Sequence, residues 1–352
     1  MAKSLDESRP PTRRPDNSAF KQQRLPAWSP SLTAGTVLPF FFLMGVLCVL
    51  LGVGLLLTVR GTQEIKVDYT DADTCETCFN LRKSSANARE RCDCNITFSL
   101  SQAFQGDVFF YYGLVNFHQN LRRYMDSRDD GQMVGRLKNL KKPSSYCFPF
   151  THAGETPVAP CGAIANSMFN DSFFLYYHPT EGETIPVPLF RRGITWYTDK
   201  NVKFRNPEVA DKNLSQVFEG TAPPVYWQRP VYELDPSDPQ NNGFINEDLI
   251  VWMREAAFPN FKKLYGILNR SQARFEAGLP AGNYSVDISY NYPVEYFQGR
   301  KLVVLSTVSW FGGQNHFLPI AYMVTGGLVL VVAMVLTGVY LKLGKGRVDL
   351  ED

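Results

Sequence analysis

The hydrophobic and polar positions divide the chain into two long apolar runs and a mixed region between them. Residues Val37–Val59 and Phe317–Leu341 contain no charged residue. About 20 apolar residues cross the core of a bilayer, so each run predicts a transmembrane helix. The alternatives are a cleaved signal peptide for the first run and a buried core helix for the second. Both runs are longer than those segments usually are.

Between these runs the pattern changes to short alternating and aromatic segments. Three of them predict strands, namely Asp107–Tyr112, Tyr284–Tyr290 and Lys301–Trp310. Another stretch predicts a helix that begins at Asn246 and continues through apolar positions to Leu268, kinked or split at Pro259. We therefore expect an α+β membrane protein in which two transmembrane helices flank a large, mostly antiparallel β domain.

Charge predicts which side of the membrane holds the ends of the chain. Lys and Arg number 36 against 34 Asp and Glu, so no global bias indicates nucleic-acid binding. The first 36 residues carry six basic and three acidic side chains, and more basic residues follow the second run. Basic residues beside membrane helices favour the cytosol. The predicted order is a cytosolic tail over 1–36, helices over 37–59 and 317–341 around an ectodomain over 60–316, and a cytosolic tail over 342–352.

The middle of the chain has the marks of an oxidising compartment. It holds five Asn-x-Ser/Thr sequons, which predict N-glycosylation at Asn95, Asn170, Asn213, Asn269 and Asn283. An even set of cysteines predicts three disulfides among Cys75, Cys78, Cys92, Cys94, Cys147 and Cys161. A zinc site of four thiolates is the alternative, although a Cys-x-Cys pair is tighter than the usual ligand spacing. Cys48 is expected to be a small packing residue, with lipidation as its alternative.

The sequence contains no motif typical of catalysis. The four His residues lack metal-ligand spacing, and no nucleophile, phosphate-binding or kinase signature occurs. Residues Asp238–Leu249 resemble a calcium loop in part, but Gln240 and Leu249 replace two of its usual ligands. The simpler expectation is a turn at Asn242-Gly243 and a helix that begins at Asn246. We therefore expect no enzyme activity, no metal and no cofactor.

Several blocks of the chain carry a family resemblance. They are RRPDNSAFKQQRLPAW at its N-terminal end, then Tyr111–Tyr124, Ala159–Phe173, Gly193–Pro207, Asn241–Met253, Leu279–Tyr284 and Asn291–Val294. In this order, and with the two apolar runs, they resemble the cell cycle control protein 50 family. Members of that family are the non-catalytic β-subunits of type IV P-type ATPases, the lipid flippases. The resemblance runs from about Arg13 to Tyr322 and is closest to vertebrate members.

The resemblance implies an accessory β-subunit that pairs with a catalytic ATPase α-subunit among membrane lipids. It would support folding of the complex, its exit from the endoplasmic reticulum and aminophospholipid transport from the exoplasmic to the cytosolic leaflet. The expected membranes are the endoplasmic reticulum, the Golgi with secretory vesicles, and the plasma membrane. The implied disulfides are Cys75–Cys94 around Cys78–Cys92, and a separate Cys147–Cys161. The alternative function is a cell-surface receptor or adhesion protein that binds a ligand through its ectodomain.

The N-terminal block implies a cytosolic strap that docks on the ATPase. Its expected partner-binding residues are Asp16, Asn17, Phe20, Gln23, Arg24, Leu25, Pro26 and Trp28. Pro26 and Pro30 are expected to keep the strap extended. The alternative is an interfacial anchor, with Trp28 at the depth of the lipid headgroups.

Overall fold

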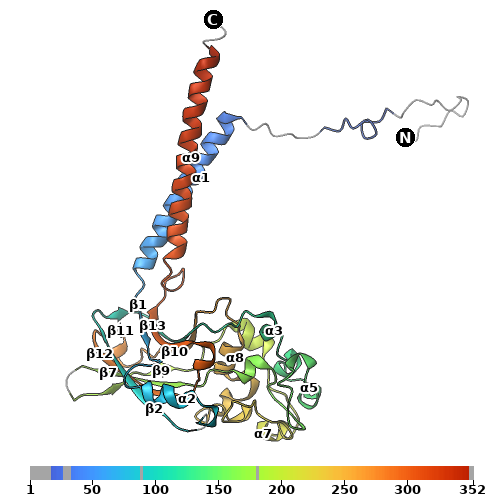
Figure 1. The fold of residues 1–352 in the computed structure, drawn as a ribbon, viewed down its shortest axis with the longest axis vertical. Coiled ribbons are helices and arrows are strands. Elements are labelled where there is room, and N and C mark those ends of the chain that lie inside the picture. The colour runs from blue at the N-terminus through green and yellow to red at the C-terminus, as the bar shows by residue number, and fades with distance from the viewer. Residues whose placement is uncertain (1–16, 27–32, 88–89, 180–181, 349–352) are drawn as a thin grey trace, which may run out of the picture. The chain divides into compact units, whose positions relative to one another are not determined.

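The computed structural model describes residues 17–26, 33–87, 90–179 and 182–348. The chain forms two compact units, residues 1–53 with 318–352 and residues 54–317. We call the second unit the large domain. The two long helices are α1 (Ala34–Arg60) and α9 (Phe317–Val348), both labelled in Figure 1. Each contains a span that is long and apolar enough to cross a membrane.

Glycines allow α1 and α9 to pack closely. A Cβ atom on Gly52 would lie 2.9 Å from the backbone oxygen of Pro319, and one on Gly326 would lie 2.8 Å from the oxygen of Gly45. The same position on Gly326 lies 2.9 Å from the Cβ atom of Cys48, so Cys48 is a packing residue, as predicted. Small residues at such contacts are typical of paired membrane helices.

Two antiparallel sheets form the framework of the large domain. The first has the order β1 (Glu64–Asp68), β13 (Arg300–Thr307), β4 (Val108–Val115), β10 (Phe261–Leu268) and β9 (Leu189–Phe190). The second has the order β2 (Asp93–Leu100), β12 (Gly282–Ser289), β7 (Ser172–His178) and β8 (Ile185–Pro186). Strands β4, β12 and β13 confirm the three strands that the alternating pattern predicted.

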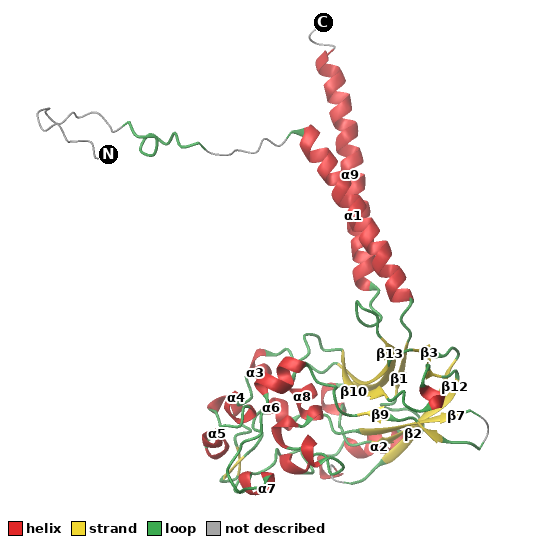
Figure 2. Ribbon diagram, turned by 180° about the vertical axis from the view of Figure 1, so that it is seen from behind, coloured by secondary structure: helices red, strands yellow, loops and turns green. Residues whose placement is uncertain are grey.

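Short elements complete the domain. Two small antiparallel pairs join β3 (Phe104–Gln105) to β11 (Gly278–Leu279) and β5 (His152–Ala153) to β6 (Thr156–Pro157). The short helices are α2 (Glu76–Arg82), α3 (Arg122–Met125), α4 (Asp130–Met133), α5 (Leu137–Lys141), α6 (Ala163–Asn166), α7 (Leu214–Val217) and α8 (Glu247–Met253). Figure 2 shows that most of them gather at one end of the large domain, beside the strands.

Aromatic side chains join the two sheets of the large domain. Phe110 of β4 and Tyr265 of β10 lie 5.5 Å and 4.9 Å from the ring of Phe173 on β7, measured between ring centroids. The Tyr265 hydroxyl also accepts a hydrogen bond of 2.8 Å from the Phe173 backbone N–H. Because large aromatic rings bury much apolar surface, this cluster stabilises the contact between the sheets.

The predicted helix is right at its start and wrong after Met253. Asn246 caps α8, since its side chain accepts a hydrogen bond of 2.9 Å from the Leu249 N–H. Residues Phe261–Leu268, predicted as helix, instead form β10. A bulge between Leu264 and Gly266 shifts the alternation of that strand, so its apolar residues mimic a helical period.

A buried lysine also obscured the strand pattern of β10. Lys263 is 7% exposed, and its Nζ atom donates to the carbonyl oxygens of Val251, Trp252 and Arg254. These carbonyl groups lie at the C-terminal end of α8, where no later N–H group of the helix is available to bond them. A positive charge on the core face of a strand cannot be distinguished, in sequence, from one on the solvent face.

The segment that resembles a calcium loop folds into the turn that was also predicted. Gly243 has a φ of +80°, the left-handed conformation expected after Asn242. The Asp238 carboxylate accepts a hydrogen bond from the Gln240 N–H. It also forms an ion pair of 2.6 Å with Arg192. The Asp238 carboxylate is therefore held by partners from the protein itself.

Candidate partner interface and cavity of the large domain

The described part of the N-terminal segment is a single turn followed by three residues without helix or strand. The Gln22 N–H bonds to the Ser18 carbonyl oxygen, and the Arg24 N–H bonds to that of Ala19. Gln23 closes the turn with a φ of +53°. The prediction of an extended strap is therefore wrong for residues 19–23, because local hydrogen bonds satisfy the backbone there. Residues 24–26 continue without helix or strand.

The turn presents apolar side chains to its surroundings. Phe20 is 76% exposed and Leu25 is 57% exposed. Asn17, Gln23, Arg24 and Pro26 are exposed as well. Asp16 and Trp28, the other expected contacts, lie outside the described residues. A short segment with two exposed apolar side chains and a neighbouring cation has the composition of a site that binds another protein.

The large domain also exposes aromatic side chains. Trp196 and Tyr197 are 64% and 80% exposed, within one of the blocks that carry the family resemblance. The guanidinium of Arg254 lies 4.2 Å from the centre of the Trp196 ring and pairs with Asp199 at 2.6 Å. These contacts order the Trp196 side chain while most of its surface stays open.

The five sequon asparagines differ in their exposure. Asn170, Asn213 and Asn283 are exposed, whereas Asn95 and Asn269 are half-buried. The Asn213 side chain caps α7 by accepting from the Gln216 N–H. The Asn95 amide donates to Asp287.

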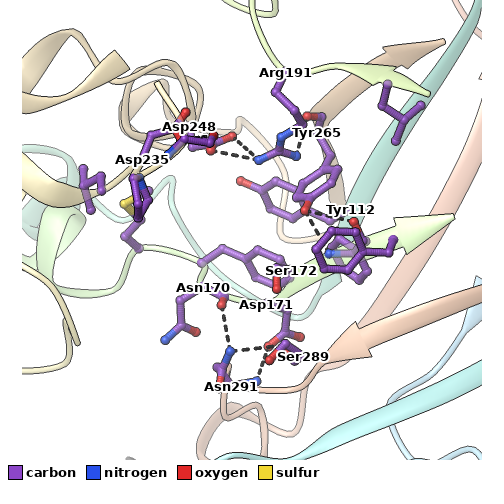
Figure 3. Close-up of a pocket in the computed structure, with 18 of the residues that line it drawn as sticks. Tyr112, Asn170, Asp171, Ser172, Arg191, Asp235, Asp248, Tyr265, Ser289 and Asn291 are labelled. Carbon is purple, nitrogen blue, oxygen red and sulfur yellow. Dashed lines mark hydrogen bonds and ion pairs between the residues drawn. The ribbon is translucent and has the colours of Figure 1, made fainter. Parts of the chain in front are cut away.

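A cavity of about 690 Å³ lies in the large domain. Figure 3 shows Arg191 and Asp248 on one wall, Asn170 and Asn291 on the opposite wall, and the rings of Tyr112 and Tyr265 between them. Its volume lies within the range of about 300–1,000 Å³ that is usual for ligand sites. The cavity therefore has room for an organic ligand with both ring and polar surfaces.

The polar wall of the cavity is rigid. The Nη2 atom of Arg191 donates to both carboxylate oxygens of Asp248, at 2.9 and 2.8 Å, and its Nη1 atom donates to the Tyr265 carbonyl oxygen at 2.7 Å. The same guanidinium lies 3.3 Å from the centre of the Tyr265 ring. Two-pronged pairing and ring contact hold Arg191 in one orientation.

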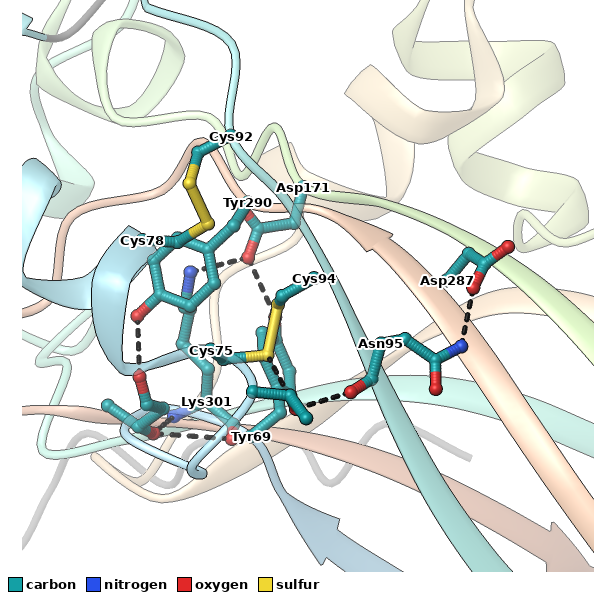
Figure 4. Close-up of a disulfide and its surroundings, with 12 residues drawn as sticks. Tyr69, Cys75, Cys78, Cys92, Cys94, Asn95, Asp171, Asp287, Tyr290 and Lys301 are labelled. Carbon is teal, nitrogen blue, oxygen red and sulfur yellow. Dashed lines mark hydrogen bonds and ion pairs between the residues drawn. A yellow bond between two sulfur atoms is a disulfide. The ribbon is translucent and has the colours of Figure 1, made fainter.

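A buried ion pair lies beside the opposite wall, because its member Asp171 lines the cavity. Figure 4 shows this pair. The Nζ atom of Lys301 is 2.6 Å from Asp171 and 3.0 Å from the centre of the Tyr290 ring, and both charged side chains are buried. Asp171 also accepts from the Tyr69 hydroxyl at 2.7 Å. Burial lowers the pKa of Lys301 to about 8, against the opposing effect of Asp171. The pair links β13 to the segment that enters β7.

The three disulfides are the pairs that the resemblance implied. Cys75 joins Cys94 and Cys78 joins Cys92, so the second bridge is nested in the first (Figure 4), and Cys147 joins Cys161 separately. Closing these short loops restricts the unfolded chain, which contributes roughly 2–4 kcal/mol per bridge in a loop-entropy account. The thiols are consumed in these bonds, and the zinc alternative is therefore wrong.

Sequence reasoning missed the Arg191–Asp248 and Lys301–Asp171 pairs. The partners are far apart in the chain, and each is an ordinary charged residue in its own neighbourhood. Asp171 is the middle residue of the sequon at Asn170, Asp248 lies in the first turn of the predicted helix and Lys301 begins a predicted strand, but none of these signals indicates a buried ion pair. No local pattern reports that a carboxylate will be buried by a strand formed much later in the chain.

Two apolar helices that flank one disulfide-bonded antiparallel domain define an integral membrane protein of the two-span class. The sequence model of the LEM3 (ligand-effect modulator 3) family / CDC50 family matches residues 55–346. The chain belongs to this family.

Relatives match the chain over most of its length. Cell cycle control protein 50A of Mus musculus is 51% identical over 327 residues, which are 92% of this chain and 88% of that protein. Cell cycle control protein 50C of Bos taurus is 50% identical, over 94% of this chain and 95% of that protein. ALA-interacting subunit 3 of Arabidopsis thaliana is 36% identical, over 94% of this chain and 87% of that protein.

Proposed function

We propose that this chain is the accessory β-subunit of a phospholipid-transporting type IV P-type ATPase. The observation that carries the proposal is the family match over residues 55–346, together with the whole-chain similarity to a protein named as an interacting subunit. The chain supports folding of the ATPase, its exit from the endoplasmic reticulum and its transport of aminophospholipid toward the cytosolic leaflet. It works in membranes of the endoplasmic reticulum, the Golgi with secretory vesicles, and the cell surface.

In this proposal both ends of the chain are cytosolic and the large domain is lumenal or extracellular. Basic residues in the N-terminal 36 positions and after the second span support that orientation. The three disulfides and five sequons of residues 60–316 support it independently, because both features belong to the secretory side.

The proposed contact with the ATPase includes the N-terminal strap. Its turn over residues 19–23 carries Phe20, and the exposed Arg24 and Leu25 follow directly. Burial of such side chains on a partner contributes affinity because aromatic residues and Arg dominate interface energies. The interfacial-anchor alternative would place the same side chains in lipid headgroups instead.

A triple substitution of Phe20, Arg24 and Trp28 to Ala tests the strap. The variant is co-expressed with a type IV P-type ATPase, and recovery of the complex and lipid-stimulated ATP hydrolysis are measured. We expect the affinity for the ATPase to fall about tenfold or more, since truncation of one important residue at a protein interface costs about 2 kcal/mol. The Lys3→Ala/Arg9→Ala variant is the control, because it changes the charge of the tail outside the strap.

Wild-type recovery and hydrolysis in the triple variant would contradict the strap. Weaker membrane attachment of the tail in that case would identify an interfacial anchor. A receptor or adhesion protein, the alternative function, would be purified without any ATPase.

A further inference from the structure

We propose that the cavity of the large domain binds carbohydrate, and that its occupant is the N-glycan attached to Asn170. The inference rests on the proposed function for its orientation, because N-glycans are added only on the secretory side. It goes beyond that function by assigning a ligand to a cavity that the subunit role does not explain.

The backbone fixes the position from which this glycan would start. Phe169 and Asp171, on either side of Asn170, are 6% and 4% exposed, whereas Asn170 itself is exposed. Asp171 accepts from the backbone N–H groups of Asn291 and Tyr292. The Asn291 amide also donates to the Asn170 carbonyl oxygen at 3.2 Å. The root of the glycan is therefore held rigidly on the cavity wall (Figure 3).

The Asn170 side chain is available for the attachment. Its amide makes no hydrogen bond within the part of the chain that the structure describes, unlike the amide of Asn95, which donates to Asp287. A glycan on Asn170 would start from a residue that itself lines the cavity, directly beside that surface.

The cavity has the surfaces that sugars need. Phe174 and Tyr226 line it and remain 62% and 64% exposed. The face of an aromatic ring is partly negative, so it attracts the C–H groups on the face of a sugar. Arg229, Gln228 and Ser237 line the same cavity and supply donors and acceptors for sugar hydroxyls.

Because the glycan is covalently attached beside the cavity, weak contacts are sufficient to keep it bound there. A ligand tethered next to its site has an effective concentration in the millimolar range, so even modest affinity keeps it bound. Asn213 and Asn283 are exposed and are not among the residues that line this cavity. Glycans on those two residues are natural controls within the same molecule.

The experiment measures the rate at which peptide-N-glycosidase releases each glycan from the folded, full-length chain in detergent, followed by site-specific mass spectrometry. We expect release at Asn170 to be at least about tenfold slower than at Asn213 and Asn283, which corresponds to about 1.4 kcal/mol of protection. The Phe174→Ala/Tyr226→Ala variant should accelerate release at Asn170 toward the rate at Asn213. Both side chains are exposed, so their removal spares the core.

The Tyr146→Ala variant is the matched control, because Tyr146 is 71% exposed and does not line the cavity. It should leave the Asn170 rate unchanged. Equal release at Asn170 and Asn213 in the wild type would overturn the inference, and so would protection that persists in the Phe174→Ala/Tyr226→Ala variant. An unmodified Asn170 beside glycosylated Asn213 and Asn283 would overturn it and leave the proposed function intact. Absence of glycan from all five sequons would overturn both.

Discussion

The helix pair and the large domain are stabilised in different ways. Helices α1 and α9 approach where glycines leave space, so the contact depends on the absence of side-chain atoms. The large domain depends instead on aromatic rings, three disulfides and the Lys301–Asp171 pair. Lipid surrounds membrane helices with an apolar medium, so burial of apolar surface contributes little between them, whereas it dominates in water. Added atoms should therefore harm the first unit, and lost partners should harm the second.

The largest expected effect is loss of the buried ion pair. Lys301→Met leaves the Asp171 carboxylate without its cationic partner in a fully buried site. Removal of one member of such a pair costs about 3–5 kcal/mol. Thermal unfolding of the purified chain would measure the loss. Arg122→Met is the control, because Arg122 and Asp126 are 92% and 58% exposed in their ion pair, and its loss should change stability by less than about 1 kcal/mol. Equal stability of the two variants would contradict a structural role for the pair.

A smaller effect is expected from adding a side chain between the helices. Gly326→Leu places atoms against the Gly45 carbonyl and Cys48, whereas a Cβ on its neighbour Gly327 meets nothing within 4 Å. Overpacking of this kind costs about 1–3 kcal/mol. Unfolding of the full chain in detergent measures the cost. Stability should fall with Gly326→Leu and stay unchanged with Gly327→Leu. Equal stability of the two variants would mean that glycine packing does not control the contact.

The third expected effect is a dependence of stability on pH. Burial lowers the pKa of Lys263 to about 7, below the ordinary value of 10.5. Above this value the native Lys263 loses a proton that the unfolded chain keeps, so stability should rise from about pH 7 to pH 9.5. Buried tyrosines such as Tyr112 have raised pKa values and reverse the trend above about pH 10. Denaturant unfolding at several pH values measures this slope, and Lys263→Met should reduce it. A slope unchanged in Lys263→Met would contradict the assignment.

The sequence predicted best those features that depend on local composition. The spans follow from the thickness of a bilayer, and strands β4, β12 and β13 follow from their alternating residues. The cap at Asn246 and the turn at Gly243 follow from the chemistry of single residues.

Features that depend on distant partners were not predictable. Strand β10 looked helical because its bulge and the buried Lys263 disturb the alternation, and its neighbours β4 and β9 decide its state. The cavity combines residues from β4, β7, β10 and the loops around Arg191 and Tyr226. Nothing in a local stretch indicates that such residues will meet, because their proximity is set by the pairing of the strands.

Purification in mild detergent from native membranes tests the central claim most directly. The chain is tagged, recovered without cross-linking, and its partners are identified by mass spectrometry and quantified. As an accessory β-subunit, it should bring with it an equimolar, much larger, multispanning P-type ATPase. The strap variant with Phe20, Arg24 and Trp28 changed to Ala should bring less. Recovery of the chain alone, or with a soluble extracellular ligand in place of an ATPase, would contradict the proposed function.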